Sequence, residues 1–198
     1  MLMNQTESTH VHQVCSVESG EHFVQIYNKD QSLIDCLFAF LTRGFKSDEV
    51  AIVIATRAHR NALEKQFVAA GYSVPELKRT GKYAPFDAAE TLGLFMHEGQ
   101  PEAFRFNALV GALIKSAARK GNGVRAFGEM VAILWDEGNR DGAIELEHLW
   151  NELAKQHSFT LFCAYREDQF AGDKDRAGFP AVCHAHSTVI GRPGMSCA

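Results

Sequence analysis

Short apolar runs alternate with longer segments of helical periodicity along this chain. The runs are compact and rich in β-branched or aromatic residues, which is typical of strands covered on both faces of a parallel sheet. EVAIVIA at residues 49–55 is the most continuous of them. We expect strands at 22–27, 49–55, 124–128 and 159–165, and a last or edge strand at 187–190.

Between the strands, apolar residues recur at i, i+3 and i+4, the spacing of a helix with one buried face. The first such segment follows a possible N-cap at residues 30–32 and ends near Gly44. Residues 72–82 and the polar segment after residue 171 lack this spacing and are expected to be loops, the former with a short strand at most. Further helices are predicted at 57–70, 88–97, 101–120, 130–137 and 140–157, with a helical turn near 167–171.

This alternation predicts βαβ units with right-handed crossovers, and therefore a three-layer α/β/α sandwich with a mostly parallel sheet. We expect one domain at residues 21–190, a flexible N-terminal tail at 1–20 and a C-terminal tail at 191–198. Ligands of such folds bind at the carboxyl ends of the strands. The residues expected there are 27–30, 56–57, 129–130 and 165–166.

Composition excludes several classes of function. The chain has 198 residues, of which 46% are hydrophobic and 22% charged, with a net charge of −4. This is an ordinary globular composition, and without a long basic run it does not favour nucleic acids or anionic membranes. No apolar run is long enough to span a bilayer, and the N-terminus does not resemble a signal peptide. The five cysteines include no CxxC pair, which predicts reduced thiols and a cytoplasmic protein.

The loop after the first strand does not have the chemistry of a phosphate-binding loop. Such a loop needs glycines that let backbone N–H groups approach the phosphates, followed by Lys and Ser or Thr. Residues 27–32 read YNKDQS, without a glycine and without Ser or Thr directly after Lys29. A standard ATP site is therefore not expected.

Two carboxylates lie in apolar surroundings and invite explanation, because a buried carboxylate needs a partner. Glu147 shares one stripe of its helix with Trp150, and Glu129 directly follows a strand. Glu147 is either a structurally paired carboxylate or a polar anchor in a ligand pocket. Glu129 is either stabilised at a helix N-terminus or acts on a metal or water, as in nucleotide hydrolases, although that role loses force without a phosphate loop.

Other candidate chemistry is weaker. Residues 183–186 read CHAH, but zinc sites usually combine paired short spacings and no second pair is near, so we predict no metal. No nucleophile elbow is present, and Cys163 is expected to be buried and inert, so we predict no enzyme activity and no cofactor. Trp135, Trp150, Tyr83 and Phe86 could line an apolar cavity for a small organic ligand.

Taken together, the ordered segments resemble the MEDS domain, a sensory domain first described in methanogens, methylotrophs and a dichloromethane-responsive regulator. The resemblance covers about residues 20–190. The segments that carry it are HFVQIY (22–27), EVAIVIAT (49–56), GKYAPFDAAETLGLFM (81–96), VRAFGEMVAILWDEGN (124–139), AIELEHLWNEL (143–153), FTLFCAY (159–165) and HSTVI (186–190).

The resemblance implies a RecA/KaiC-like fold without a phosphate loop and a role in sensing small molecules, including hydrocarbon derivatives. Family members are often fused to kinase modules or to a DNA-binding helix-turn-helix, neither of which is expected here. The output is therefore predicted to be a signalling partner protein, a homo-oligomer or an element that the sequence does not identify. The residues predicted to bind the ligand are Tyr27, Arg57, Tyr83, Glu129, Trp135, Glu147 and Trp150.

Two alternative functions stay open at this point. One is a degenerate nucleotide-binding or ATPase module that uses Lys29, Arg57 and Glu129. The other is a structural interaction domain whose exposed apolar helix faces mediate assembly.

Overall fold

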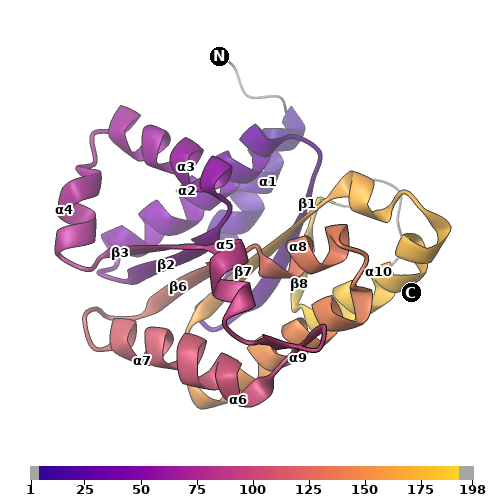
Figure 1. Ribbon diagram of the computed structural model, residues 1–198. Helices are drawn as coiled ribbons and strands as arrows, with labels where there is room; N and C mark the ends of the chain where they lie inside the picture. Colours follow the sequence, from indigo (N-terminus) through magenta and orange to yellow (C-terminus); the bar gives the residue numbers. More distant parts are fainter. Residues whose placement is uncertain (1–4, 192–198) are drawn as a thin grey trace.

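The computed structural model describes residues 5–191, which form a six-stranded parallel sheet with helices on both faces (Figure 1). The predicted α/β fold with a mostly parallel sheet is confirmed. The strands β1 (His22–Tyr27) and β7 (Thr160–Arg166) lie side by side inside the sheet and pair in parallel. In spatial order the strands are β3 (Tyr83–Asp87), β2 (Val50–Ala55), β6 (Val124–Gly128), β7 (Thr160–Arg166), β1 (His22–Tyr27) and β8 (Thr188–Ile190).

Each face of the sheet has its own layer of helices and its own hydrophobic core. One face is covered by α1 (Gln5–Ser16), α2 (Asp30–Lys46), α3 (Arg57–Ala69) and α4 (Val74–Arg79). The other is covered by α5 (Ala88–Gly93), α6 (Ala103–Phe106), a π-helical turn (Asn107–Gly111), α7 (Ala112–Ala118), α8 (Met130–Asp136), α9 (Arg140–Gln156) and α10 (Asp173–Ala185). A small hairpin of β4 (Met96–His97) and β5 (Gln100–Pro101) and a 3₁₀ turn (Glu167–Phe170) complete the fold.

Burial on both faces explains why the strands are apolar almost without interruption. In β1, Phe23 points into one core, where it stacks on Phe162 at 4.6 Å between ring centroids. The next residue, Val24, points into the opposite core. Successive side chains of a strand point to opposite faces, so a strand with two covered faces needs apolar residues at nearly every position.

The prediction of a flexible tail at residues 1–20 is wrong for α1. This helix lies on α2, with Val14 and Val17 buried in the core beneath it. The Arg43 guanidinium of α2 donates a hydrogen bond to the carbonyl of Val17 at 3.0 Å. The polar composition of α1 hides these contacts, because two buried valines and a tertiary hydrogen bond stabilise the helix rather than a regular apolar stripe.

Two segments expected to be loops contain regular structure. In residues 72–82, Ser73 caps α4 and a proline occupies its first turn, which is a favourable helix start despite the short length. The polar segment after residue 171 forms α10, although Pro180 lies inside the helix. Gly178 allows α10 to lie close to Trp135, since a Cβ at this glycine would come within 2.7 Å of the indole.

The structure also bears on the cysteines. Cys15, Cys36 and Cys163 are free thiols, as predicted, whereas Cys183 lies in a disulfide, so the prediction of reduced cysteines is wrong there.

Within residues 5–191, no helix combines the length and the apolar content needed to cross a membrane. Most of the predicted C-terminal tail, residues 192–198, lies outside the described part of the chain.

Replacing Val14 by Ala tests whether α1 belongs to the folded core. We expect V14A to lower the free energy of unfolding by about 1–2 kcal/mol, because it removes apolar contacts at a fully buried position. Gln13, its exposed neighbour on the same helix, provides the control, and Q13A should stay within about 0.5 kcal/mol of wild type. Urea denaturation measures both. Equal effects of the two substitutions would show that α1 does not contribute to the core.

Candidate functional site

A pocket of about 190 Å³ opens where β1, β2, β6 and β7 end. This is the edge of a parallel sheet at which α/β folds bind ligands, because loops and helix starts converge there around the strand ends. The residues that line the pocket are Tyr27, Asp30, Thr56, His59, Glu129, Ala132, Ile133, Asp136, Arg166 and Gln169. Of the strand-end positions expected from the sequence, 27, 30, 56, 129 and 166 line it.

A buried carboxylate–imidazole pair forms the base of this pocket. Glu129 follows β6, and its Oε2 accepts a hydrogen bond from the Thr56 backbone N–H at 2.7 Å. Its Oε1 lies 2.6 Å from His59 Nδ1. The Thr56 side chain caps α3 and accepts from the His59 backbone N–H, which orients the first turn of that helix. The end of β2 and the end of β6 are therefore joined through one carboxylate.

The charges around this pair shift two pKa values. Burial lowers the pKa of His59, but the hydrogen bond and charge of Glu129 outweigh it, and the net shift is upward. Asp30, whose Oδ1 lies 3.6 Å from His59 Nε2, adds to this shift. Burial and the charges of Glu129 and Asp30 also raise the pKa of the Tyr27 phenol. Tyr27 thus remains a protonated hydrogen-bond group beside the pair.

The pocket carries more acidic than basic groups. Asp30, Glu129 and Asp136 contribute carboxylates, while Arg166 and His59 are the basic residues lining it. The Arg166 guanidinium donates to both carboxylate oxygens of Asp168, at 2.9 and 2.8 Å. Arg166 is therefore paired with a carboxylate that does not line the pocket, and His59 is paired with Glu129.

The connection between β1 and α2 confirms that a phosphate-binding loop is missing at this edge. Only Asn28 and Lys29 separate the strand from the helix, and neither is a glycine. The backbone N–H of Thr56, at the end of β2, is already bonded to Glu129. A phosphate-binding loop presents several free backbone donors, and the Thr56 N–H is not one of them.

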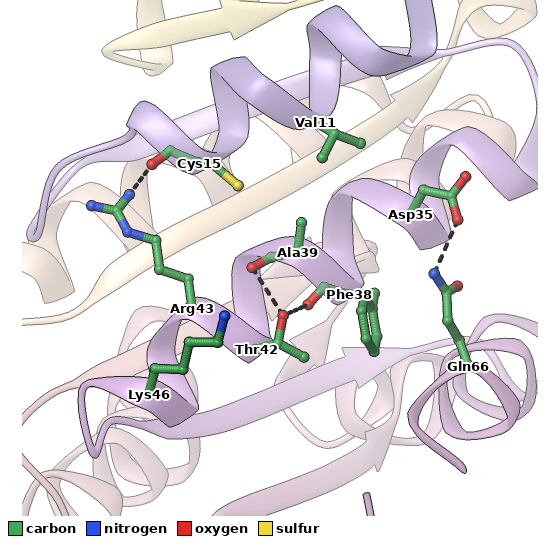
Figure 2. Close-up of a pocket in the computed structure, with 9 residues that line it drawn as sticks. All are labelled: Val11, Cys15, Asp35, Phe38, Ala39, Thr42, Arg43, Lys46 and Gln66. Carbon is green, nitrogen blue, oxygen red and sulfur yellow. Dashed lines mark hydrogen bonds between the residues drawn. The ribbon is translucent and has the colours of Figure 1, made fainter. Parts of the chain in front are cut away.

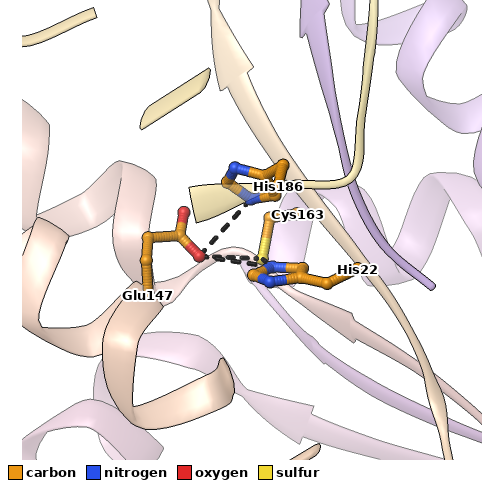
Figure 3. Close-up of side chains that lie close together, drawn as sticks. All are labelled: His22, Glu147, Cys163 and His186. Carbon is orange, nitrogen blue, oxygen red and sulfur yellow. Dashed lines mark hydrogen bonds and ion pairs between the residues drawn. The ribbon is translucent and has the colours of Figure 1, made fainter. Parts of the chain in front are cut away.

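Glu147, the second carboxylate singled out in the sequence, lies elsewhere. It belongs to the buried cluster, by which we mean His22, Glu147, Cys163 and His186, between β1, β7, α9 and the end of α10 (Figure 3). All four side chains are buried, and Glu147 has no exposed surface. The hydroxyl of Tyr165 donates to Glu147 Oε1 at 2.8 Å. The sequence interpretation of Glu147 as a paired buried carboxylate agrees with these contacts.

Part of this cluster has the order of a nucleophile, a base and an orienting amide. Cys163 Sγ lies 3.3 Å from His22 Nε2, and His22 Nδ1 lies 2.9 Å from Asn151 Oδ1. Such a triad needs an accessible thiolate. Cys163 is instead fully buried, and burial together with the charge of Glu147 raises the pKa of its thiol well above the usual value. The arrangement therefore does not support nucleophilic catalysis.

The other residues predicted to bind a ligand do not line the strand-end pocket. Arg57 is an exposed residue in the first turn of α3. Trp135 is buried against Tyr165, and its Nε1–H donates to the Gln169 carbonyl at 3.0 Å. Trp150 is buried in the core, with its ring centroid 5.2 Å from that of Phe106.

Two larger cavities lie elsewhere in the structure. Tyr83 lines one of them, and helices α1 to α3 line the other. Tyr83 lines a cavity of about 380 Å³ near the start of β3, and its hydroxyl donates to Glu64 at 3.3 Å. A groove of about 440 Å³ runs between α1 and α2, with Val11, Phe38 and Ala39 on its walls (Figure 2). Helix side chains form this groove, whereas strand ends with converging polar groups form the 190 Å³ pocket. We therefore place the candidate site at the pocket.

Comparison with known families agrees with the resemblance inferred from the sequence. Residues 21–178 match the family model described as MEDS, the methanogen/methylotroph, DcmR sensory domain. The chain belongs to the MEDS family. Membership gives this MEDS chain a sensory signalling role, and the match extends from β1 into α10. No curated protein matches the chain closely.

Sequence reasoning missed three polar residues of the MEDS pocket: His59, Asp136 and Gln169. His59 lies one turn after the strand-end residue Thr56, so its position in the first turn of α3 could have signalled it. Asp136 ends α8, and Gln169 lies in the 3₁₀ turn after β7. Neither of these two has a local sequence signal, because the fold alone brings them to the pocket.

The His59–Glu129 pair should give the MEDS domain a pH-dependent stability term. The pKa of His59 is raised in the folded state, so the stabilisation is complete below the unfolded value of about 6.5 and is lost as the pH rises through the folded value. At pH 6, the free energy of unfolding of E129Q should be about 1–3 kcal/mol lower than that of wild type. This difference should shrink at alkaline pH. Urea denaturation across this range, with NMR titration of His59, measures both effects.

The substitution H148Q serves as the control for this experiment, because His148 is an exposed histidine on α9. Its unfolding free energy should follow that of wild type at every pH. A difference between E129Q and wild type that does not change with pH would contradict a stabilising charge on His59.

Proposed function

We propose that this MEDS domain senses a small organic molecule with a cationic or hydrogen-bond-donating group, bound in the strand-end pocket at Glu129. The observation that carries the proposal is the buried carboxylate of Glu129, one of three acidic residues that line the pocket. The pocket lies at the edge of the sheet where α/β folds bind ligands. The sensory role of the family supports the same conclusion at the level of the whole domain.

The volume of the pocket limits the size of the ligand. Pockets for drug-sized ligands span about 300–1,000 Å³. The pocket at Glu129 measures about 190 Å³, so it suits a molecule of a few heavy atoms. A complete nucleotide would have to extend well beyond it.

The charge of the pocket limits the chemistry of the ligand. Carboxylates of Asp30, Glu129 and Asp136 repel phosphates and carboxylates, while they attract ammonium groups and accept hydrogen bonds from amides or alcohols. The ring of Tyr27, packed edge-on against His59 at 6.3 Å, adds an aromatic wall beside these acceptors. Small amines and related polar compounds therefore fit better than anions or pure hydrocarbons.

Ligand binding at Glu129 could change the start of α3. The same carboxylate holds the Thr56 backbone N–H and the His59 imidazole. A ligand that donates a hydrogen bond to Glu129 Oε1 competes with His59, which is bonded to the same oxygen. Binding therefore favours a different arrangement of the first turn of α3, which provides a route from the ligand to a signalling partner.

A thermal-shift screen followed by calorimetry tests this proposal. Small primary and quaternary ammonium compounds, neutral amides and alcohols, small carboxylates and Mg-ATP are compared as probes. We expect an amine or a neutral donor to raise the melting temperature, and E129Q to weaken its binding at least about tenfold because a charge-assisted hydrogen bond is lost.

The substitution E145Q is the matched control, because it removes the same charge from a half-exposed position on α9. It should bind the probe as wild type does. Stabilisation by Mg-ATP alone would contradict the proposal in favour of the nucleotide-binding alternative. Binding that E129Q leaves unchanged would contradict the role of this pocket.

A further inference from the structure

The four side chains of the buried cluster bring together the ligand types and spacings of a tetrahedral metal site. Glu147 Oε2 lies 3.4 Å from His22 Nε2 and 3.5 Å from His186 Nε2, and 3.5 Å from Cys163 Sγ. All four potential ligand atoms lie within 4.8 Å of one another. Zinc bonds of about 2.0–2.3 Å in a tetrahedron place their ligand atoms about 3.3–3.8 Å apart. The three separations from Glu147 Oε2 already fall in this range, so small side-chain movements would complete the site.

Hydrogen bonds on the far side of each imidazole direct its other nitrogen into the cluster. Asn151 donates through Nδ2 to the Ala185 carbonyl at 2.9 Å, which turns its Oδ1 toward His22 Nδ1. The Val182 carbonyl lies 2.6 Å from His186 Nδ1. Each Nδ1 therefore carries the proton, and each Nε2 presents a lone pair to the centre. Metal-binding histidines are held by outer hydrogen bonds of this kind.

The cluster holds more lone pairs than protons. Both Nε2 atoms and Glu147 Oε2 are acceptors, while the Tyr165 hydroxyl is used on the other oxygen, Oε1. Only the thiol of Cys163 has a proton to offer, and it can satisfy one acceptor. His186 Nε2 has no hydrogen-bond partner although it is buried. Converging lone pairs in a buried site need protons or a cation between them.

A divalent metal ion balances the charge better than extra protons do. Protonating one imidazole would balance the charge of Glu147 but leave the other Nε2 lone pair facing the carboxylate. Protonating both would bury two cations beside one carboxylate, which is costly away from water. A divalent ion bound by a thiolate, a carboxylate and two neutral imidazoles leaves no net charge. Thiolate and imidazole ligands in a tetrahedral arrangement favour zinc over calcium or magnesium, which prefer oxygen ligands.

We propose that the buried cluster binds one Zn²⁺ ion in a structural site. The sequence predicts no metal, because no second short-spaced pair of ligands lies near residues 183–186. The ligands come instead from four distant segments, and His186 alone belongs to that motif. The cluster shares no residue with the strand-end pocket, so this inference does not depend on the proposed function.

Such an ion would hold the C-terminal part of the fold to its centre. His186 lies directly between α10 and β8, whereas His22 and Cys163 lie on the central strands β1 and β7. With every ligand buried, the ion would be bound as the chain folds, so that binding energy becomes folding energy. Removing the ion should therefore loosen α10 and β8 first.

Cobalt substitution tests the site directly. The full chain is unfolded with a chelator, refolded with Co²⁺ or Zn²⁺, and analysed for bound metal. We expect one ion per chain, the visible spectrum of tetrahedral Co²⁺ with a thiolate-to-cobalt charge-transfer band, and loss of that spectrum when Zn²⁺ displaces cobalt. The zinc-loaded chain should melt about 5–10 °C above the metal-free chain, and α10 and β8 should gain protection from hydrogen exchange.

Matched variants assign the ligands. C163S should lose the charge-transfer band, whereas C36S, which alters another buried free cysteine, should keep it. H186Q should weaken binding at least about tenfold, whereas H184Q, at an exposed position two residues away, should not. Circular dichroism establishes that each variant folds.

The wild-type spectrum decides the proposal even where a variant does not fold. A wild-type chain that refolds with Co²⁺ but gives no tetrahedral spectrum would overturn it. Retention of the charge-transfer band in folded C163S would overturn it as well.

Discussion

The pairing of β1 with β7 is the interaction on which both sites depend. It joins a strand near the start of the described chain to one more than 130 residues later, in parallel and in a fixed register. At the carboxyl ends, this register sets Tyr27 opposite Arg166, and both line the strand-end pocket. At the other end, it brings His22 onto the same face as Cys163. A shift of one residue would turn each of these side chains to the opposite face and dismantle both sites.

Burial on both faces of the sheet explains why each carboxylate there has a dense set of partners. Glu129 binds a backbone N–H and an imidazole, and Glu147 lies among two imidazoles, a phenol and a thiol. An ionised carboxylate without partners would be prohibitively costly at such depth. The two solutions differ in access. Glu129 borders a pocket and can exchange partners with a ligand, whereas Glu147 is enclosed and suits a permanent structural role.

The sequence predicted the parts of the molecule that depend on local pattern. Continuous apolar runs identified the central strands, and the rule for strand ends identified Tyr27 and Glu129 as neighbours in the pocket. It did not identify α1, which is stabilised by tertiary contacts of two buried valines in and directly after the helix, or α10, whose proline and glycine disguise a helix. The buried cluster was also beyond reach, because His22 and His186 meet only through strand pairing. Residue spacing carries no information about such long-range contacts.

A continuous series of contacts connects the buried cluster to the pocket. Tyr165 donates to Glu147, and its ring lies 5.7 Å from that of Trp135. The Trp135 indole in turn donates to the backbone carbonyl of Gln169. The side chain of Gln169 lines the pocket and donates to the Ala132 carbonyl at 2.9 Å. Contact alone does not transmit a signal, since coupling requires an element with two arrangements that both sites influence. The 3₁₀ turn that carries Gln169 is the candidate for such an element. It contacts Trp135, which packs against Tyr165 of the cluster's surroundings, and it also lines the pocket.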